Sequence, residues 1–436
     1  MENQDIQFPS WLIVDEKGKK KVNEVEFCKM YLKSRTLKCI GGQFRDMQGD
    51  VGEEEIKHEI AQILMEHIVE GVYNKVKSLC GTLKLKCYSE PPTVCEDEIH
   101  LLNGILNTNG KFTEEQRFCT NRLNAEYDLS APPPKKFMQF LSDLLEPDDI
   151  ITLQEYLGYL LIPSTRGQAM MSIIGNGGEG KSVLGTVVKD IFGSSMVEGS
   201  FRRIETDRFF RANLKGKLVF VDDDLQLEAL PSTGYIKSLI TVQIPTDIEY
   251  KGRQSFTEKL YARFLCFGNG TVKSLRDKSY GFSRRMIILS AKSIADNRKT
   301  NPNIADEIIA EKSGILNWIF EGLKRLIANN YQFTLSERAK LNACEMSSDN
   351  CNIIEFLSAT NTVTFSEAAE ISSTVLFGAY SKWCDENALT AIKREPFITW
   401  LKTNQQKYNI RYSRHITTTD GGCVRGFKGI KTANSG

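Results

Sequence analysis

Closely spaced cysteine and histidine residues, which could bind a metal ion together, are scarce in this sequence. Its 436 residues include 11 cysteines but only 4 histidines, and no C-x-x-C pair occurs. Zinc sites and small disulfide-stapled domains are built from such closely spaced cysteines. Their absence excludes both classes, and we expect reduced thiols, which are typical of a cytoplasmic protein.

Long apolar runs are absent too. The first residues, "MENQDIQF", are polar and acidic, unlike a signal peptide, and no apolar stretch approaches the roughly 20 residues that span a bilayer. We therefore expect no membrane partner. An excess of one charge is also lacking, because the net charge is +1, so any nucleic-acid-binding surface must be local. Apolar residues make up 41% of the chain, which is ample for globular domains, about three by length.

Glycine is concentrated in one short segment. The segment "GNGGEGKS" follows an apolar run at 169–174 and precedes 183–192, where apolar residues recur with helical spacing. Glycines allow consecutive backbone N–H groups to point into one concavity, and the start of a helix adds partial positive charge. The pattern G-x-x-x-x-G-K-S therefore predicts a phosphate-binding loop. Its residues are Gly175, Asn176, Gly177, Gly178, Glu179, Gly180, Lys181 and Ser182.

Two residues of this loop have specific expected roles. We expect Lys181 to reach the β- and γ-phosphates of a nucleotide and the Ser182 hydroxyl to ligate Mg²⁺. ATP and Mg²⁺ are therefore the expected cofactors. An ordinary glycine turn is the alternative, and the flanking strand and helix disfavour it.

Acidic residues follow a second apolar run, in "KLVFVDDDL". Residues 218–221 are expected to form a buried strand that Asp222 follows directly. We expect Asp222 to hold the water shell of Mg²⁺ and Asp223 to polarise the attacking water. Asp224 competes for the second role, and spacing does not separate the two.

Polar residues flank two further apolar runs. "ARFLCFGNG" predicts a strand at 264–267 that ends at Asn269, whose amide would orient the attacking water. Arg284 and Arg285 precede an expected strand at 286–289. An arginine at a subunit edge can neutralise charge on the γ-phosphate held by a neighbouring subunit, and the residues alone leave Arg284 and Arg285 as alternatives for this role. A turn at Asn269 and a pair of surface arginines are the alternatives.

The order of these segments resembles helicase superfamily three, and most of all the phage, plasmid and poxvirus-type primase-helicases. The segments "GNGGEGKS", "LVFVDDD", "FLCFGN" and "GFSRRMIIL" carry the resemblance, and "LLNGILNTNGKF" and "LQEYLGYLL" extend it upstream. The family implies an AAA+ ATPase that assembles as a hexameric ring around DNA and unwinds it 3′-to-5′. It also implies that Arg284 is the arginine that acts on the site of a neighbouring subunit. Two features depart from it: the chain has no room for a primase, which we expect as a separate partner, and the acidic motif is Asp-Asp where Asp-Glu is common.

The family places a DNA-tracking hairpin between the acidic motif and Asn269. Here Lys251, Gly252 and Arg253 form a turn flanked by alternating residues, with Tyr250 and Phe256 available to pack or stack. We expect Lys251 and Arg253 to contact DNA phosphates without reading sequence. A solvated turn is the alternative.

The C-terminal segment has a pattern of its own. Two amphipathic helices precede a β-hairpin with the turn "DGG", which predicts a winged-helix domain. Basic residues concentrate on the hairpin, and we expect Arg425 and Lys428 to contact DNA. A small packing module with a solvated surface is the alternative.

Together these features predict an α/β protein. We expect an α-rich, helical N-terminal domain at 1–130, an AAA+ P-loop ATPase core at 131–335, and a winged helix at 350–436. The expected function is that of an ATP-dependent replicative DNA helicase and initiator of a phage, plasmid or mobile element. It would bind single-stranded DNA and origin duplex. The alternative is an AAA+ ATPase that assembles at an origin or recombination site without processive unwinding.

Overall fold

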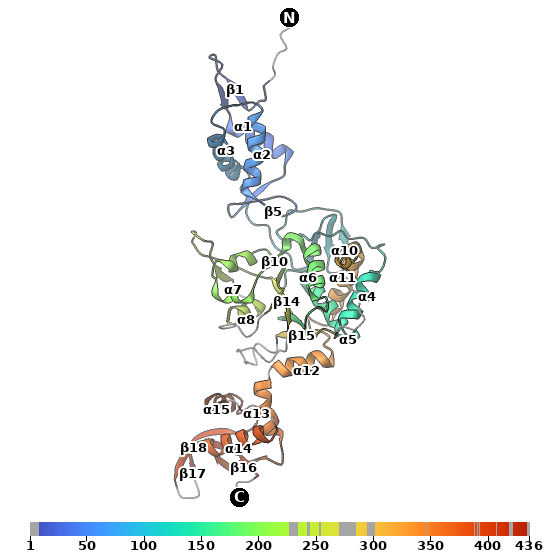
Figure 1. The fold of residues 1–436 in the computed structure, drawn as a ribbon. Helices are drawn as coiled ribbons and strands as arrows, with labels where there is room; N and C mark the ends of the chain where they lie inside the picture. The colour runs from blue at the N-terminus through green and yellow to red at the C-terminus, as the bar shows by residue number, and fades with distance from the viewer. Residues whose placement is uncertain are drawn as a thin grey trace. The chain divides into compact units, whose positions relative to one another are not determined.

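The computed structural model contains two compact units (Figure 1). The first lies within Met1–Gly270 and Ile287–Ser336, and the second within Thr271–Met286 and Glu337–Gly436. The structure describes residues 8–225, 234–241, 245–252, 254–269, 285–293, 301–346, 348–387, 389, 391, 393–406, 408–417 and 422–433. No helix among these residues is long and apolar enough to cross a membrane. The three expected domains, with limits at 130, 335 and 350, stay a prediction.

The N-terminal part of the first unit combines three helices with short strands. Its elements are β1 (Leu12–Val14), β2 (Lys20–Val22), α1 (Glu24–Ser34), β3 (Lys38–Ile40), β4 (Gln43–Arg45), β5 (Asp50–Val51), α2 (Glu53–Met65) and α3 (Val72–Lys86). The helices bury one apolar core, with Phe27, Ile56 and Leu79 among its members. The strands contain only two or three residues each, which is too few to show an alternating pattern in the sequence.

Two further parts of the first unit lie before and after the central sheet in the sequence. The first contains β6 (Glu98–Leu101), β7 (Gly104–Asn107), β8 (Phe112–Thr113), α4 (Lys135–Leu144) and α5 (Pro147–Leu160), and the second contains α10 (Ile304–Ile309) and α11 (Lys312–Ala328). Helices α5 and α11 approach closely because glycines lie at their contact. A Cβ on Gly158 would meet the backbone of Leu323, and one on Gly322 would meet the carbonyl of Gln154.

A five-stranded sheet forms the centre of the first unit. Its strand order is β10 (Met196–Glu198), β11 (Val219–Asp222), β14 (Arg263–Asn269), β9 (Met170–Gly175) and β15 (Met286–Ser290). The pairings of β10 with β11, β11 with β14 and β14 with β9 are parallel. The strands expected at 169–174, 218–221, 264–267 and 286–289 are therefore confirmed.

Helices flank this sheet on both sides in the view of Figure 1, with α7 and α8 on the left and α4 and α6 on the right. They include α6 (Lys181–Phe192), α7 (Phe201–Thr206) and α8 (Gly234–Thr241), and the 3₁₀ turns are η1 (Gly193–Ser195) and η2 (Phe210–Leu214). Parallel strands covered by helices bury both faces of a sheet, so each strand reads as a continuous apolar run. This is why the sequence predicted the strands well.

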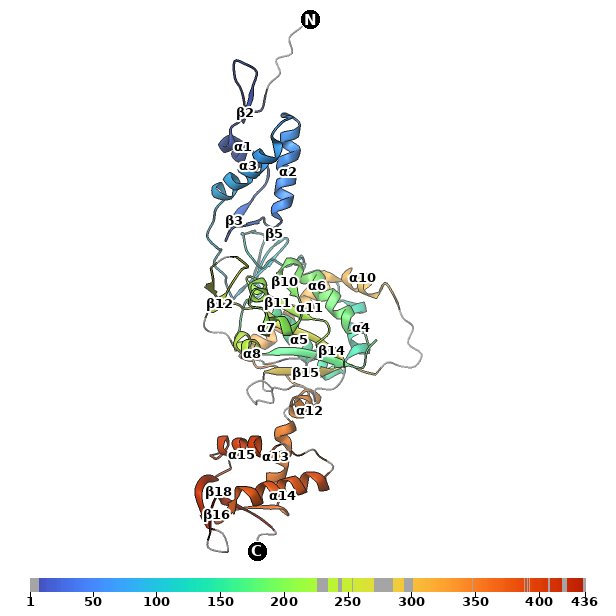
Figure 2. The ribbon, with the colours of Figure 1, turned by 60° about the vertical axis from the view of Figure 1, so that its left-hand side comes forward.

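A short antiparallel hairpin, β12 (Thr246–Ile248) with β13 (Phe256–Glu258), belongs to the same unit (Figure 2). It is present where the sequence predicted a basic turn. Thr246 pairs with Glu258 and Ile248 with Phe256, so the chain reverses between residues 249 and 255.

The second unit combines helices with an antiparallel sheet. It contains α12 (Glu337–Met346), α13 (Ser348–Ser358), β16 (Val363–Ser372), α14 (Ser373–Glu386), α15 (Arg394–Thr403), β17 (Arg411–Thr417) and β18 (Cys423–Thr432). The sheet order is β16-β18-β17. Leu376 and Tyr380 of α14 and Phe397 and Leu401 of α15 are fully buried in one core. Both predicted helices and the hairpin strands are confirmed, and β16 was not anticipated.

Candidate nucleotide-binding site

The loop between β9 and α6 owes its shape to three glycines. Gly177, Gly178 and Gly180 have φ values of 107°, 85° and 109°. Residues with side chains rarely adopt this left-handed conformation, so the loop depends on glycine at these positions. Helix α6 begins at Lys181, directly after the loop. The structure therefore joins strand, glycine loop and helix as the motif predicts.

The concavity of this loop holds the carboxylate of Glu179. The backbone N–H groups of Asn176 and Gly177 both donate to Glu179 Oε1, the latter at 2.9 Å. Lys181 Nζ lies 2.7 Å from Glu179 Oε2, and the two side chains are only 8% and 3% exposed. Burial opposes ionisation of Glu179, yet the bonds from Lys181 and the backbone hold its pKa below the ordinary value. The backbone N–H groups of the loop and the ammonium group of Lys181 thus converge on one anion. This is the set of donors that a phosphate requires.

Asp222 ends β11 and is buried. Its Oδ2 accepts a 2.8 Å hydrogen bond from the N–H of Phe201, the first residue of α7, and its Oδ1 accepts one of 3.2 Å from Asp224. Burial raises the pKa of Asp222. Asp223 and Asp224 are both exposed. The bond to α7 was missed by sequence reasoning, because it joins residues 21 apart and no local pattern signals it.

The ends of three strands bring the predicted residues together. Asn269 is paired in register with Gly175, the first residue of the loop, and Asp222 with Cys266 on the other side of β14. Parallel neighbouring strands lie about 4.8 Å apart and end at the same edge of the sheet. The glycine loop, the amide of Asn269 and the three aspartates therefore share one edge. Asn269 and Ser182 are exposed there.

Two of the predicted residues, Arg284 and Arg253, lie outside the described residues. Arg285, the alternative to Arg284, is half-buried and directly precedes β15, which is hydrogen-bonded to β9. The assignment of a trans-acting arginine stays a prediction.

The β12–β13 hairpin carries Lys251 at its turn. Lys251 and Gly252 are exposed, and the φ value of 77° at Gly252 makes the turn depend on glycine. The ring of Tyr250 stacks on that of Phe256, with centroids 5.6 Å apart and planes 25° apart. Tyr250 follows β12 and Phe256 begins β13, so the two rings pack on each other across the hairpin.

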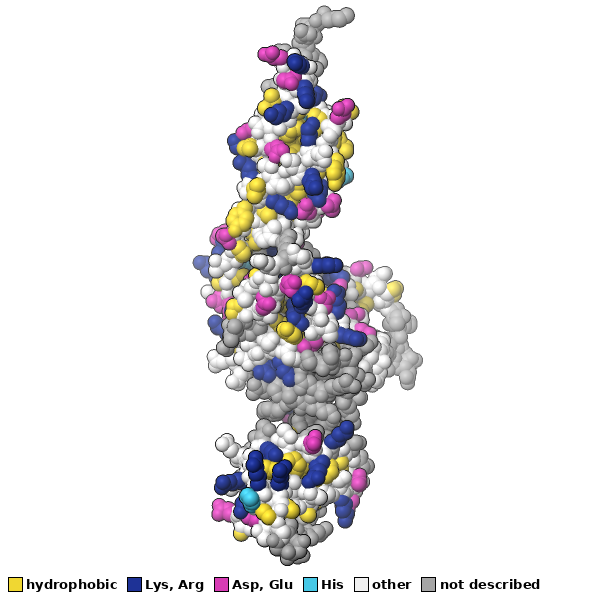
Figure 3. Space-filling model, turned by 90° about the vertical axis from the view of Figure 1, so that its left-hand side faces the viewer, with side chains coloured by type: hydrophobic (Ala, Val, Ile, Leu, Met, Phe, Trp, Pro, Cys, Tyr) yellow, Lys and Arg dark blue, Asp and Glu magenta, His cyan; other side chains and the backbone are white. Residues whose placement is uncertain are grey.

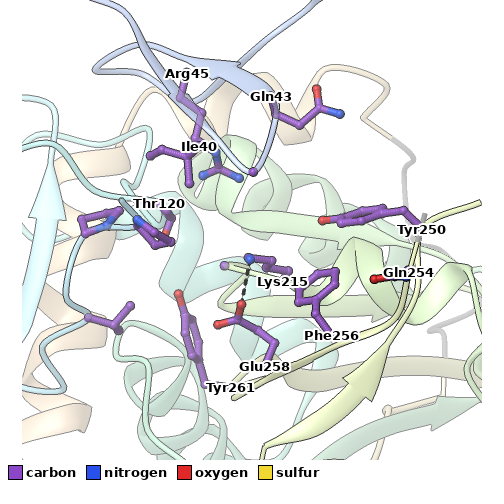
Figure 4. Close-up of a pocket in the computed structure, with 15 residues that line it drawn as sticks. Ile40, Gln43, Arg45, Thr120, Lys215, Tyr250, Gln254, Phe256, Glu258 and Tyr261 are labelled. Carbon is purple, nitrogen blue, oxygen red and sulfur yellow. Dashed lines mark ion pairs between the residues drawn. The ribbon is translucent and has the colours of Figure 1, made fainter. Parts of the chain in front are cut away.

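A cavity of about 290 Å³ lies beside this hairpin (Figure 4). Lys215 and Arg45 line it, but Lys215 Nζ lies 2.7 Å from Glu258 and Arg45 Nε lies 2.8 Å from Asp50. Each of these two cations is therefore paired with a carboxylate, whereas Lys251 is exposed at the turn of the hairpin.

Basic residues gather on the hairpin of the second unit. Strands β17 and β18 contain no acid, and their basic residues are Arg411, Arg414, Arg425, Lys428 and Lys431. Figure 3 shows Lys and Arg side chains together on one face of this unit. Arg425 is exposed, as predicted for a DNA contact, whereas Lys428 forms an ion pair with Glu370 of β16. Sequence reasoning missed that partner, because β16 was not anticipated.

Comparisons with known proteins agree with this architecture. A family model described as "Family of unknown function (DUF5906)" matches residues 173–285, a range that runs from β9 to the residue before β15. No curated protein shows significant sequence similarity to the chain. Among solved structures, the chain is similar to the apo structure of the C-terminal region (305–718) of NrS-1, with a TM-score of 0.55 and 13% identity, covering 93% of this chain and 99% of that one. The A form apo structure of the same region gives a TM-score of 0.51 at 13% identity, covering 92% and 98%. At this identity the likeness concerns the fold, and it extends over both units.

Proposed function

We propose that this protein is an ATP-driven motor acting on DNA, a replicative helicase with an AAA+ type P-loop core. One observation carries the proposal above others. The glycine loop holds the carboxylate of its own Glu179 beside the buried Lys181. This site lies at the edge of a parallel sheet where acids and an amide from two other strands converge. Ligands of α/β proteins bind at this edge.

The residues at the edge suit nucleoside triphosphate hydrolysis. Lys181 would pair with the β- and γ-phosphates, and the Ser182 hydroxyl with Asp222 would hold Mg²⁺, which neutralises charge on the phosphates. Asn269 would orient the attacking water, and Asp223 or Asp224 would polarise it. Asp222 is fixed by α7 and is buried, whereas its two neighbours are exposed, so the first aspartate suits a structural and metal role and the others suit proton chemistry.

The second unit supports contact with DNA. Its elements follow the order helix, strand, helix, helix, strand, strand from α13 to β18, which fits a winged helix. The hairpin of a winged helix contacts the DNA backbone, and here the charged residues on the two strands of the hairpin are all basic. The exposed Lys251 turn of the first unit offers a second contact for a strand of DNA.

A ring of subunits, with Arg284 acting on the site of a neighbour, completes the proposal. A separate primase would supply primers. The alternative function, assembly on duplex DNA without unwinding, is favoured by one observation: the basic hairpin lies in a compact unit apart from the sheet that carries the glycine loop.

Two assays test these proposals. Steady-state ATP hydrolysis by the full chain, with and without single-stranded DNA, tests the motor. Hydrolysis that neither requires Lys181 nor responds to DNA would contradict it. A forked duplex with a 3′ tail then separates the two functions, because only the helicase displaces a strand.

A further inference from the structure

We infer that Glu179 is an internal competitor for the phosphate cradle, and that it sets how tightly the loop binds a phosphate chain. The inference rests on the proposed function for the identity of the ligand, a nucleoside triphosphate. The competition itself follows from the contacts of the carboxylate.

The Glu179 carboxylate fills the concavity of the loop. It accepts hydrogen bonds from the N–H groups of Asn176 and Gly177 and pairs with Lys181 Nζ at 2.7 Å. A Cβ atom built on Gly175 would lie 2.8 Å from the carboxyl carbon of Glu179, so the carboxylate packs against the first residue of the loop as well. The donors that a phosphate would use are therefore the donors that Glu179 uses.

A phosphate and the carboxylate cannot occupy these donors together. Both are anions, and the Glu179 side chain is only 3% exposed, so a ligand must first turn this side chain out of the loop. An intramolecular competitor acts at an effective concentration in the millimolar range or above. Charge-assisted hydrogen bonds of this kind contribute about 1.5 kcal/mol or more, which corresponds to about tenfold in affinity.

A purely structural role for Glu179 makes the opposite prediction. If the carboxylate served only to hold the loop in its binding shape, removing it would loosen the loop and weaken phosphate binding. If it competes, removing it tightens binding. The sign of the change in affinity therefore distinguishes the two roles.

The experiment measures the Kd of Mg²⁺-ATP and of inorganic pyrophosphate by calorimetry for the full chain. We expect Glu179→Gln to tighten both ligands about tenfold and by the same factor, because each must displace the same carboxylate. Glu179→Asp keeps the charge but is one methylene shorter, so it should reach the loop N–H groups poorly and should also tighten binding. Glu198→Gln is the matched control, because it removes an exposed carboxylate of the same sheet that pairs with Lys189 at 3.0 Å, and it should change neither Kd.

The outcomes separate this inference from the function on which it rests. Unchanged or weaker binding by Glu179→Gln, with wild-type binding intact, overturns the competition alone. Tighter binding by Glu179→Gln with wild-type affinity in Glu179→Asp also overturns it, because general charge repulsion would then explain the gain. Absence of ATP and pyrophosphate binding in every variant, with folding verified by thermal denaturation, overturns the proposed nucleotide site together with the inference.

Discussion

The glycine loop of the first unit and the basic hairpin of the second are the two proposed phosphate-binding regions, and they hold their cations differently. Lys181 is 8% exposed and is paired within its own loop, two residues from its partner. Arg425 and Arg411 are exposed on strands that contain no acid. A buried, paired cation suits a small ligand that must be desolvated, whereas exposed cations suit a long, hydrated polyanion.

The loop was predictable from the sequence because its contacts are local. Its contacts join residues two or three positions apart, so the spacing of eight residues contains nearly all of the geometry. The flanking strand and helix follow from apolar periodicity, and both are confirmed. The position of Asn269 beside Gly175 depends on the order of the strands in the sheet, and the sequence does not show that order.

Contacts between distant residues were not predictable. The bond from Phe201 to Asp222 depends on where α7 begins, and the ion pair of Lys428 depends on β16, whose ten residues show no strict alternation of apolar and polar side chains. The exposure of a basic residue can therefore be predicted from a sequence, but the presence of an acidic partner from a distant element cannot.

Loss of the buried cation should have the largest effect. We expect Lys181→Ala to reduce ATP hydrolysis by about a hundredfold or more, because the developing charge on the phosphates loses a desolvated partner. Steady-state release of phosphate measures it. Lys189→Ala is the control, since this exposed lysine near the end of α6 pairs with Glu198 and should leave the rate unchanged. Normal hydrolysis by Lys181→Ala would place the active site elsewhere.

The exposed aspartates at the same edge should come next. We expect Asp223→Asn to retain ATP binding and to lose turnover by about a hundredfold, a typical contribution of a general base. Binding of a fluorescent ATP analogue and single-turnover hydrolysis check the two parts separately. Asp224→Asn is the matched variant, and if it alone abolishes turnover, the base is Asp224.

The turn of the β12–β13 hairpin should affect coupling rather than chemistry. We expect Lys251→Ala to keep ATP hydrolysis without DNA and to lose several-fold in its stimulation by single-stranded DNA. Each lost phosphate contact should also flatten the dependence of log affinity on log salt by about one unit. Lys215→Ala is an informative comparison, because this lysine is already paired with Glu258 and should alter the slope less. Equal slopes for Lys251→Ala and wild type would indicate a solvated turn.

An exposed arginine of the second unit should have a smaller effect, confined to binding. We expect Arg425→Ala to weaken duplex binding by the full chain a few-fold at low salt and to reduce the salt slope by about one unit. Fluorescence anisotropy over a salt series measures both quantities. ATP hydrolysis without DNA should not change, and a loss of that activity would show that the two regions depend on each other.

The smallest effect should come from Lys428, on the same strand as Arg425. Lys428 pairs with Glu370, and the two side chains are 45% and 33% exposed, so the pair stabilises the fold by no more than about 1 kcal/mol. To contact a phosphate, Lys428 must leave Glu370, and the uncompensated carboxylate would then repel the DNA. We therefore expect Lys428→Ala to change duplex affinity and salt slope less than Arg425→Ala does.

The reverse substitution tests the same reasoning from the other partner. Glu370→Gln leaves Lys428 in place without its counter-charge, so we expect tighter duplex binding and a salt slope steeper by up to about one unit. Glu395→Gln, on α15, is the control for removing one exposed acid from this unit, and it should act less. If Lys428→Ala instead weakens binding as much as Arg425→Ala, Lys428 leaves Glu370 for the phosphate. Lys428 and Arg425 would then be equivalent toward DNA, and the contrast with the buried pair at Lys181 would rest on burial alone.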